Sequence, residues 1–200
     1  MTIAVLAVQG AFIEHEHSLE KLGVSVVELR KKDDLDAMCD IDPATGVGKK
    51  YDGLVLVGGE STVQGKLLKE LDMFDTLKYQ IEHGLPVLAT CAGMILLAKD
   101  LANDDRTCFQ TLPVTVKRNA YGRQLGSFAV DAELSGIGTF PFRFIRAPYV
   151  EQADPQVEIL ATVDDKIVAV KYKNQLALAF HPELTDNLAV HKLFLDTMVQ

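Results

Sequence analysis

The chain has 200 residues, a formal net charge of −8 and a sequence pI of about 5.1. This length is enough for one domain with a sizeable core, and the acidic balance without a basic stripe argues against nucleic acid as a partner. Three cysteines without C-x-x-C spacing argue against a disulfide framework or a zinc site and fit a reducing cytoplasm. No apolar run approaches the roughly 20 residues of a membrane helix, and no basic segment resembling a signal peptide precedes the first apolar run.

The beginning of the chain predicts a strand, a helix and a second strand. Residues 3–8 form a continuous apolar run typical of a strand buried on both faces, and residues 9–11 follow as a tight turn. Residues 12–22 carry spaced apolar positions and end at Gly23, as a surface helix does. Ser25–Leu29 predicts the second strand, so this opening indicates a parallel sheet with crossover helices.

Two histidines of the first helix, His15 and His17, suggest a metal site together with Glu14 and Glu16. Residues two apart on a helix point in different directions, so the four side chains do not converge on one ion. We therefore expect no metal site here, and we expect these residues to lie on a solvated face of the helix.

Residues 31–50 are polar and predict a connector with an exposed tip. Residues 53–57 predict a third strand, which runs into Gly-Gly-Glu-Ser-Thr at 58–62. Two glycines at a strand end let backbone N–H groups face a ligand, and Ser61 or Thr62 can cap the next helix. This segment is either a loop for substrate and oxyanion or an ordinary turn. Two helices are predicted after it, over residues 63–71 and 74–83.

Cys91 lies between a predicted strand at residues 86–89 and an apolar run of helical character at residues 94–101. Its neighbours are small, as a close and strained strand-to-helix turn requires: Ala89, Ala92 and Gly93. This pattern is that of a nucleophile elbow with cysteine in place of serine. The N-terminus of a helix favours an anion there, and thiolate is the reactive form of cysteine. The alternative is a buried, unreactive cysteine at a strand end.

After residue 101 the pattern changes to short strand candidates separated by turns. They cover residues 111–116, 126–130, 143–145, 157–163, 166–171 and 175–180. Asp164 and Asp165 predict a hairpin tip, and residues 187–199 predict a closing helix. Because no Pro/Gly/Ser-rich linker and no internal repeat interrupts the chain, we expect a single α/β domain over residues 1–200 with an antiparallel extension in its second half.

His181 and Glu183 follow the last apolar run, and Pro182 stiffens the chain between them. A histidine at a strand end can accept a proton from a thiol, and a carboxylate two residues further on can orient its ring. Cys91, His181 and Glu183 thus form a candidate triad by role, provided that the fold brings them together. The alternative is a strand-end histidine capped by its neighbours.

Several segments, in order, carry a resemblance that runs through essentially the whole chain. They are Val-Gln-Gly-Ala at 8–11, Glu14-His15, Gly-Gly-Glu-Ser-Thr at 58–62, Thr-Cys-Ala-Gly at 90–93, Arg-Asn-Ala-Tyr-Gly-Arg-Gln at 118–124, Ser-Phe at 127–128, Phe-Ile-Arg-Ala-Pro at 144–148 and Phe-His-Pro-Glu-Leu-Thr at 180–185. With them the chain resembles the family of glutaminase subunits of pyridoxal 5′-phosphate synthases, which are class I glutamine amidotransferases. The resemblance implies a three-layer, flavodoxin-like α/β fold with a mostly parallel sheet, a Cys-His-Glu triad, and no cofactor or metal.

Carried over by position, the resemblance makes Cys91 the nucleophile, His181 the general base and acid, and Glu183 its orienting partner. The backbone N–H groups of Gly59 and Ala92 would hold the oxyanion. The residues that would bind L-glutamine are Gly59, Glu60, Ser61, Arg118, Ile145 and Arg146.

An arginine fork suits an amino acid's α-carboxylate, whereas a surface ion pair is the plainer interpretation of Arg118 and Arg146. The resemblance further implies a protein partner, the synthase subunit that accepts the ammonia, and suggests Gln9 and Gly10 as a coupling switch.

The chain departs from the family at Ala89, where glycine is usual, and at Val57, where proline is usual; residues 42–50 resemble an insertion. Two other functions stay open. One is a glutaminase subunit for another synthase, such as imidazole glycerol phosphate synthase. The other is a non-amidotransferase: a DJ-1-like stress protein, a cysteine hydrolase or a catalytically silent binding subunit.

Overall fold

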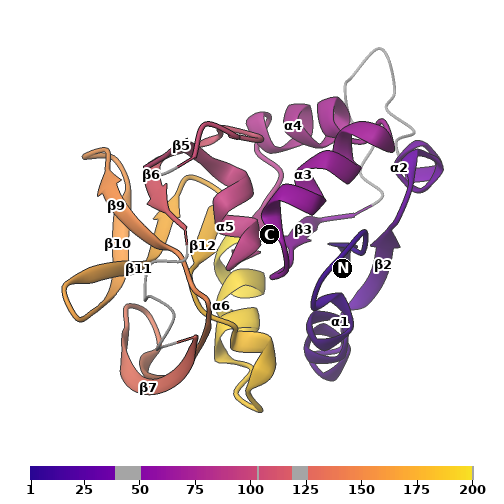
Figure 1. Cartoon of the computed structure of the whole chain (residues 1–200). Helices are drawn as coiled ribbons and strands as arrows, with labels where there is room; N and C mark the ends of the chain where they lie inside the picture. The colour runs from indigo at the N-terminus through magenta and orange to yellow at the C-terminus, as the bar shows by residue number, and fades with distance from the viewer. Residues whose placement is uncertain (39–50, 103, 119–125, 200) are drawn as a thin grey trace.

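A computed structural model describes residues 1–38, 51–102, 104–118 and 126–199 (Figure 1). Its centre is a ten-stranded sheet with the order β2-β1-β3-β4-β12-β11-β9-β6-β5, in which β10 pairs with β11 off this path. The first strands in this order are parallel, and the strands around β11 are antiparallel. The expected α/β class, mostly parallel with an antiparallel extension, is confirmed.

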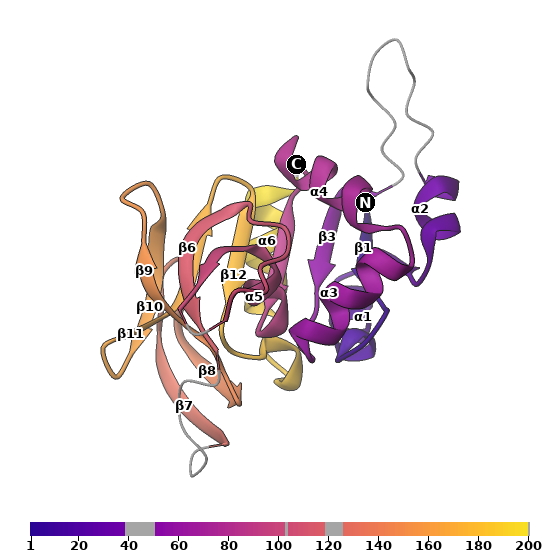
Figure 2. The same ribbon diagram turned by 45° about the horizontal axis from the view of Figure 1, so that its top comes forward.

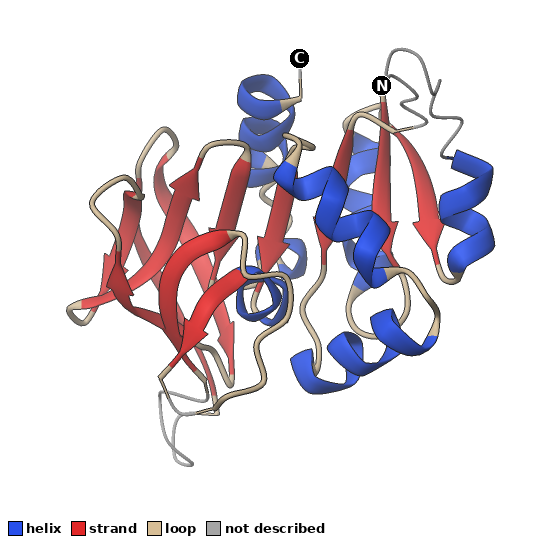
Figure 3. Ribbon diagram, turned by 90° about the horizontal axis from the view of Figure 1, so that it is seen from above, coloured by secondary structure: helices blue, strands red, loops and turns tan. Residues whose placement is uncertain are grey.

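The first half of the chain builds the parallel part. Its elements are β1 (Thr2–Leu6), α1 (Phe12–Lys21), β2 (Ser25–Leu29), α2 (Lys32–Met38), β3 (Gly53–Leu56), α3 (Ser61–Glu70), α4 (Phe74–Glu82), β4 (Val87–Thr90) and α5 (Ala92–Leu97). The chain moves outward from β1 to β2 and then back past β1 to β3. Right-handed crossovers in opposite directions put their helices on opposite faces. Accordingly α1 and α6 lie on one side of the sheet and α3 and α4 on the other, which makes three layers (Figures 1 and 3).

The second half adds the antiparallel part and a closing helix. Its elements are β5 (Ala98–Leu101), β6 (Leu112–Lys117), β7 (Ser127–Leu134), β8 (Gly138–Ile145), β9 (Tyr149–Ala153), β10 (Glu158–Val163), β11 (Lys166–Tyr172), β12 (Gln175–Leu178), the 3₁₀ turn η1 (Pro182–Leu184) and α6 (Ala189–Met198). β7 and β8 form a separate two-stranded sheet, and Figure 2 shows this hairpin extending beyond one end of the main sheet.

Strands β3 and β4 are buried along their whole length. Parallel strands covered by helices on both faces read as continuous apolar runs, which is why the sequence identified them correctly. The hairpin tip at Asp164 and Asp165 is also confirmed, because both residues have positive φ, 49° and 59°, between β10 and β11. Two consecutive left-handed residues give the backbone twist that a tight antiparallel turn needs.

Several expected boundaries are wrong. The helix expected to continue to residue 101 ends at Leu97, and β5 begins at Ala98. The expected connector at 31–50 contains α2, and residues 39–50, with the apparent insertion at 42–50, lie outside the described residues. The sequence predicted only the last three residues of β8, since Pro141 within it is a residue that strands seldom carry. It did not predict β9, where Glu151 and Gln152 interrupt the apolar pattern.

Across the parts of the chain that the structure describes, no helix combines the length and the apolar character needed to cross a membrane. The same parts contain no group of three or more His, Cys, Asp or Glu side chains arranged to hold a metal ion.

Candidate active site

Two neighbouring strands, β4 and β12, bring the candidate triad together. They run parallel, with Leu178 opposite Thr90, and the N–H of Cys91 donates to the Leu178 carbonyl at 2.7 Å. The carboxyl ends of parallel neighbours meet at one edge of a sheet, where α/β proteins commonly bind their ligands. Cys91 leaves β4 at this edge, and His181 lies three residues beyond the end of β12, so two distant parts of the sequence meet.

Cys91 occupies a strained turn between β4 and α5. Its φ of 47° and ψ of −99° are unusual for a residue with a side chain, and it is the N-cap of α5. The close approach expected from the small neighbours is visible at Gly93, where an added Cβ would lie 2.2 Å from the carbonyl oxygen of Leu56. Nucleophile elbows have this geometry, because it raises the side chain above the end of the sheet.

His181 is held by its own backbone and by the residue before it. Its N–H donates to the Arg143 carbonyl in β8 at 2.8 Å. The ring of Phe180 stacks on Phe142 of the same strand, with centroids 4.0 Å apart and an interplanar angle of 8°. The hairpin that the sequence largely failed to predict thus fixes the position of the candidate base.

Glu183 lies against the His181 ring, in the position that the candidate triad requires. Its Oε1 lies 2.7 Å from Nδ1 of His181, and the carboxylate is fully buried. On the other side, a Cβ added at Gly58 would lie 2.4 Å from Cε1 of His181 and 3.5 Å from Cβ of Cys91, so imidazole and cysteine flank one glycine. Nε2 of His181 has no hydrogen-bond partner in the described parts of the chain, which leaves this nitrogen for proton exchange with the cysteine.

The charges around His181 favour its protonated form. Burial lowers the pKa of His181, but the neighbouring Cys91 and Glu183 outweigh burial and raise it to about 10. Burial raises the pKa of Glu183, but His15 and His181 hold it below its usual value. A carboxylate that stays ionised favours the protonated form of the histidine beside it.

The solvated position expected for His15 is wrong. His15 is fully buried on the sheet-facing side of α1, with Ser18 and Leu19, while His17 is exposed as expected. Nε2 of His15 lies 3.3 Å from Oε2 of Glu183, on the far side of the candidate triad. The spacing of His15, Ser18 and Leu19 at i, i+3 and i+4 places all three on one helix face, and Leu19 in that set was the signal available in the sequence.

Gln9 lies against the Gly-Gly loop after β3, where the sequence predicted an oxyanion site. The Gln9 side-chain oxygen accepts the Glu60 N–H at 2.8 Å. The side chain of Gln64 donates to the Gln9 carbonyl, also at 2.8 Å. At Gly10, where φ is +111°, an added Cβ would lie 1.9 Å from the Gly58 carbonyl oxygen, so only glycine allows the two loops to approach this closely.

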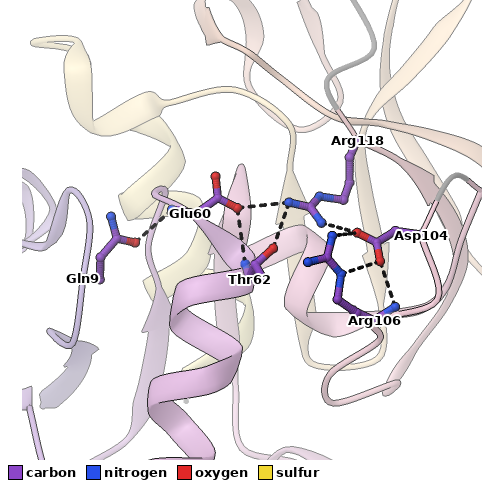
Figure 4. A network of polar contacts seen from close by, with 6 residues as sticks. All are labelled: Gln9, Glu60, Thr62, Asp104, Arg106 and Arg118. Atoms are coloured by element: carbon purple, nitrogen blue, oxygen red, sulfur yellow. Dashed lines mark hydrogen bonds and ion pairs between the residues drawn. The ribbon is translucent and has the colours of Figure 1, made fainter.

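The side chain that caps α3 is Glu60, which accepts the N–H of Thr62 at 3.4 Å, so the prediction that Ser61 or Thr62 caps this helix is wrong. Glu60 also receives an Arg118 hydrogen bond at 3.0 Å, and Thr62 receives one at 3.1 Å (Figure 4). The Arg118 side chain is only 13% exposed, so its contacts are not those of a loose surface pair.

Asp104 joins the same network, although no local pattern in the sequence distinguishes it. It forms an ion pair with Arg118, and Arg106 donates to both of its oxygens. The hydrogen bonds from Arg106 hold the pKa of this carboxyl well below its usual range. Asp104 therefore stays ionised and holds the Arg118 guanidinium near the Gly-Gly loop.

The other expected glutamine-binding residues lie around Cys91. The Cys91 sulfur is 3.9 Å from the Ile145 carbonyl oxygen at the end of β8. Arg146 follows with a positive φ of 44° and an exposed side chain, and Ala92 is the first residue of α5. A cavity of about 290 Å³ between α3 and α5 includes Ser61 and Arg118 in its lining, but not Cys91.

Comparisons with known proteins agree on one family. A model of the SNO glutamine amidotransferase family matches residues 5–200. The pyridoxal 5′-phosphate synthase subunit PdxT of Desulfitobacterium hafniense (strain DSM 10664 / DCB-2) is 56% identical over 198 residues, which is 99% of this chain and 94% of that protein. PdxT of Haemophilus influenzae (strain PittEE) is 49% identical over 197 residues, 98% of this chain and 97% of that protein. A crystal structure of a glutamine amidotransferase aligns with a TM-score of 0.85 and 39% identity, covering 97% of both chains.

Proposed function

The chain belongs to the SNO glutamine amidotransferase family, and from this we propose that it is the glutaminase subunit of a pyridoxal 5′-phosphate synthase. It is an enzyme of the glutamine amidotransferase class. The observation that carries the proposed chemistry is the convergence of the Cys91 elbow with the 2.7 Å pair of His181 and Glu183. In this proposal the chain hydrolyses L-glutamine to glutamate and ammonia, and a separate synthase subunit consumes the ammonia.

The first half-reaction forms a thioester. The Cys91 thiolate attacks the side-chain amide carbon of glutamine, and the carbonyl oxygen becomes an oxyanion held by the N–H groups of Gly59 and Ala92. One such donor is worth on the order of 3 kcal/mol in comparable sites. His181, oriented by Glu183, donates its Nε2 proton to the leaving nitrogen, so that the C–N bond breaks and ammonia departs.

The second half-reaction releases glutamate. His181, now neutral, takes a proton from water while the water oxygen attacks the thioester carbon. The C–S bond breaks, Cys91 leaves as the thiolate, and the proton stays on the imidazole. The cluster returns to its starting charge, with the Glu183 carboxylate beside an imidazolium throughout the resting state.

The proposed substrate contacts come from Gly59, Glu60, Ser61, Arg118, Ile145 and Arg146. The guanidinium of Arg118 would hold the α-carboxylate, and its present contacts with Glu60 and Asp104 keep it oriented for this task. The Glu60 carboxylate, which is half exposed, is suited to the α-ammonium group. The substrate would thus be bound by charges of both signs within one network.

The proposed partner is the synthase subunit that accepts ammonia, and Gln9 is the candidate link to it. Gln9 holds the backbone N–H of Glu60, the residue next to the proposed oxyanion donor Gly59. Partner binding that moved the segment of Gln9 and Gly10 would therefore move the oxyanion loop. We further propose that residues 1–200 form one domain in the cytoplasm, where a free Cys91 thiol is maintained.

Glutamate release with and without the synthase subunit tests the proposed function. Replacement Cys91→Ala should abolish release, and full activity of that variant would end the proposal. Cys108→Ala is the matched control, because burial raises the pKa of the Cys108 thiol to about 11 and leaves little of it as thiolate. If a different synthase subunit, and not the one for pyridoxal 5′-phosphate, stimulated release, the partner would be wrong while the glutaminase chemistry would stand.

A further inference from the structure

A pair of buried histidines lies behind the proposed triad and has no role in the mechanism above. His15 in α1 and His191 in α6 are both fully buried, and Nδ1 of His15 lies 2.9 Å from Nε2 of His191. The other nitrogen of His15, Nε2, lies 3.1 Å from Thr90 Oγ1 and 3.3 Å from Glu183 Oε2. Burying polar groups this deeply is costly unless they are hydrogen-bonded. The presence of this hydrogen-bonded pair behind the site therefore indicates a functional role.

The contacts of the two Glu183 carboxylate oxygens indicate this role. One carboxylate oxygen, Oε1, accepts the His181 ring nitrogen, whereas Oε2 is buried without a hydrogen-bond partner in the described parts of the chain. Nε2 of the His15 ring lies 3.3 Å from Oε2. A buried carboxylate with one oxygen unsupported could rotate or take up a proton, and either change would release the imidazole that it orients.

The hydrogen-bond pattern selects one arrangement of protons on the two histidines. If Nε2 of His15 carries the hydrogen, this N–H donates to Thr90 Oγ1 at 3.1 Å and lies beside Oε2 of Glu183 at 3.3 Å. Nδ1 of His15 then accepts a hydrogen from Nε2 of His191. Nδ1 of His191, for which the described residues offer no hydrogen-bond partner, is then a bare acceptor. The reverse arrangement would turn a lone pair of His15 toward the carboxylate and leave a buried N–H of His191 unpaired, which costs more.

Both histidines are held neutral, as this arrangement requires. Burial lowers the pKa of His15, opposed by Glu183 and Glu14 and assisted by His181. Burial also lowers the pKa of His191, to about 3, with His15 acting in the same direction and Glu183 against it. The cluster therefore contains the Glu183 carboxylate, the proposed reactive pair of Cys91 and His181, and the two neutral imidazoles behind them.

We propose that His15 is a positioning residue for the proposed glutaminase reaction: its Nε2–H fixes the Glu183 carboxylate, and His191 fixes the His15 ring. The proposal rests on the proposed function, since it deepens the role of the same triad. It extends the line of groups at the site from cysteine, imidazole and carboxylate to two further imidazoles, contributed by α1 and α6. Loss of the His15 contact should weaken turnover and leave glutamine binding intact.

Two substitutions of similar polarity separate positioning from packing. In His15→Gln the side-chain amide nitrogen reaches about as far as Nε2 and can still face Glu183. In His15→Asn it reaches only about as far as Nδ1, on the side of His191. We expect kcat for glutamate release, measured with the synthase subunit present, to fall roughly 10-fold to 100-fold in His15→Asn, the range seen when a residue that orients a metal-binding side chain is lost. His15→Gln should restore most of kcat, and KM for glutamine should change little in either variant.

The pH dependence of Cys91 alkylation by iodoacetamide gives a second measurement that does not require turnover. When Glu183 is less well fixed, it stabilises the imidazolium less, so the half-maximal alkylation rate should move to higher pH in His15→Asn and not in His15→Gln. The Cys91→Ala chain supplies the background from the other cysteines. His17→Asn, on the exposed face of the same helix, is the matched control and should match the wild type.

The outcomes are separable from the proposed function. A wild-type chain without glutaminase activity would refute the proposed function, whereas an active wild type with equal kcat in His15→Gln and His15→Asn would overturn the inference alone. A loss of kcat that only follows the fraction of folded protein in thermal unfolding would also overturn it. If His15→Asn does not fold, His191→Leu removes the group that fixes the His15 ring; unchanged kcat in that variant would likewise overturn the inference.

Discussion

A single methyl group at Gly58 provides a direct test of the distance between the oxyanion loop and the candidate base. In Gly58→Ala the new Cβ would lie 2.4 Å from Cε1 and 2.9 Å from Nδ1 of His181. Carbon atoms in contact are ordinarily about 3.5 Å to 4.0 Å apart, so the imidazole would have to retreat by roughly 1 Å. The loop cannot yield instead without losing the 3.0 Å hydrogen bond from the Ala11 N–H to the Gly58 carbonyl.

A misplacement of about 1 Å in a catalytic group can cost about 100-fold in rate, which corresponds to about 2.7 kcal/mol of transition-state stabilisation. We therefore expect kcat of Gly58→Ala to fall about 100-fold in the glutamate-release assay with the synthase subunit, with a smaller change in KM. Gly58 is not among the residues proposed to bind glutamine, which is why KM should respond less.

The matched control is Gly65→Ala in α3. Its Cβ would meet only the Cys108 sulfur at 3.7 Å and the Leu96 Cδ2 at 3.8 Å, which are ordinary contacts. It should keep full activity, and the fold should gain about 0.5 to 1 kcal/mol because alanine is the better residue in a helix interior. If Gly58→Ala kept its fold and retained kcat within about twofold of the wild type, the reasoning from this contact would be refuted.

Three further predictions concern charge and coupling. Burial raises the pKa of Glu183, but His15 and His181 hold it below 4.5, so the carboxylate stabilises the fold above pH 4.5 and this contribution is lost as the pH falls. Thermal unfolding of Glu183→Gln should accordingly lose less stability on acidification than the wild type, and equal losses would contradict this. Arg118→Lys should raise KM for glutamine about 10-fold with little change in kcat, because lysine cannot form the two-pronged contact; a change confined to kcat would count against it. Gln9→Ala should reduce turnover stimulated by the synthase subunit more than it reduces glutamine binding, and equal losses would exclude a coupling role.

The site depends on both local and distant parts of the sequence. The strained elbow at Cys91 was predictable because a strand, a run of small residues and a helical segment are adjacent in the chain. The pairing of His181 with Glu183 was predictable for the same reason, since only Pro182 separates them. A triad requires both residues to lie near Cys91, but the sequence did not show that they do. The structure shows it, because β12, which precedes them, is adjacent to β4.

The residues that the sequence did not identify are those whose partners come from other elements. His15 was assigned to a solvated face together with its charged neighbours, although Leu19 lies on the same face of the helix; its buried partners come from other elements. Asp104 and His191 gave no local pattern. The hairpin of β7 and β8 was predicted only in part, and β8 buries its aromatic rings against Phe180, which lies far along the chain.

The sequence by itself determined the apolar core strands, the strained cysteine turn and the candidate reactive groups, because each depends on residues that are neighbours in the chain. Only the tertiary structure decided that β4 and β12 are adjacent, that Arg118 is held between Glu60 and Asp104, and that two imidazoles lie behind the carboxylate. Each of these contacts joins residues that are far apart in the sequence. They are fixed by the packing of whole elements, which favours one arrangement of the sheet over others that the same local patterns allow.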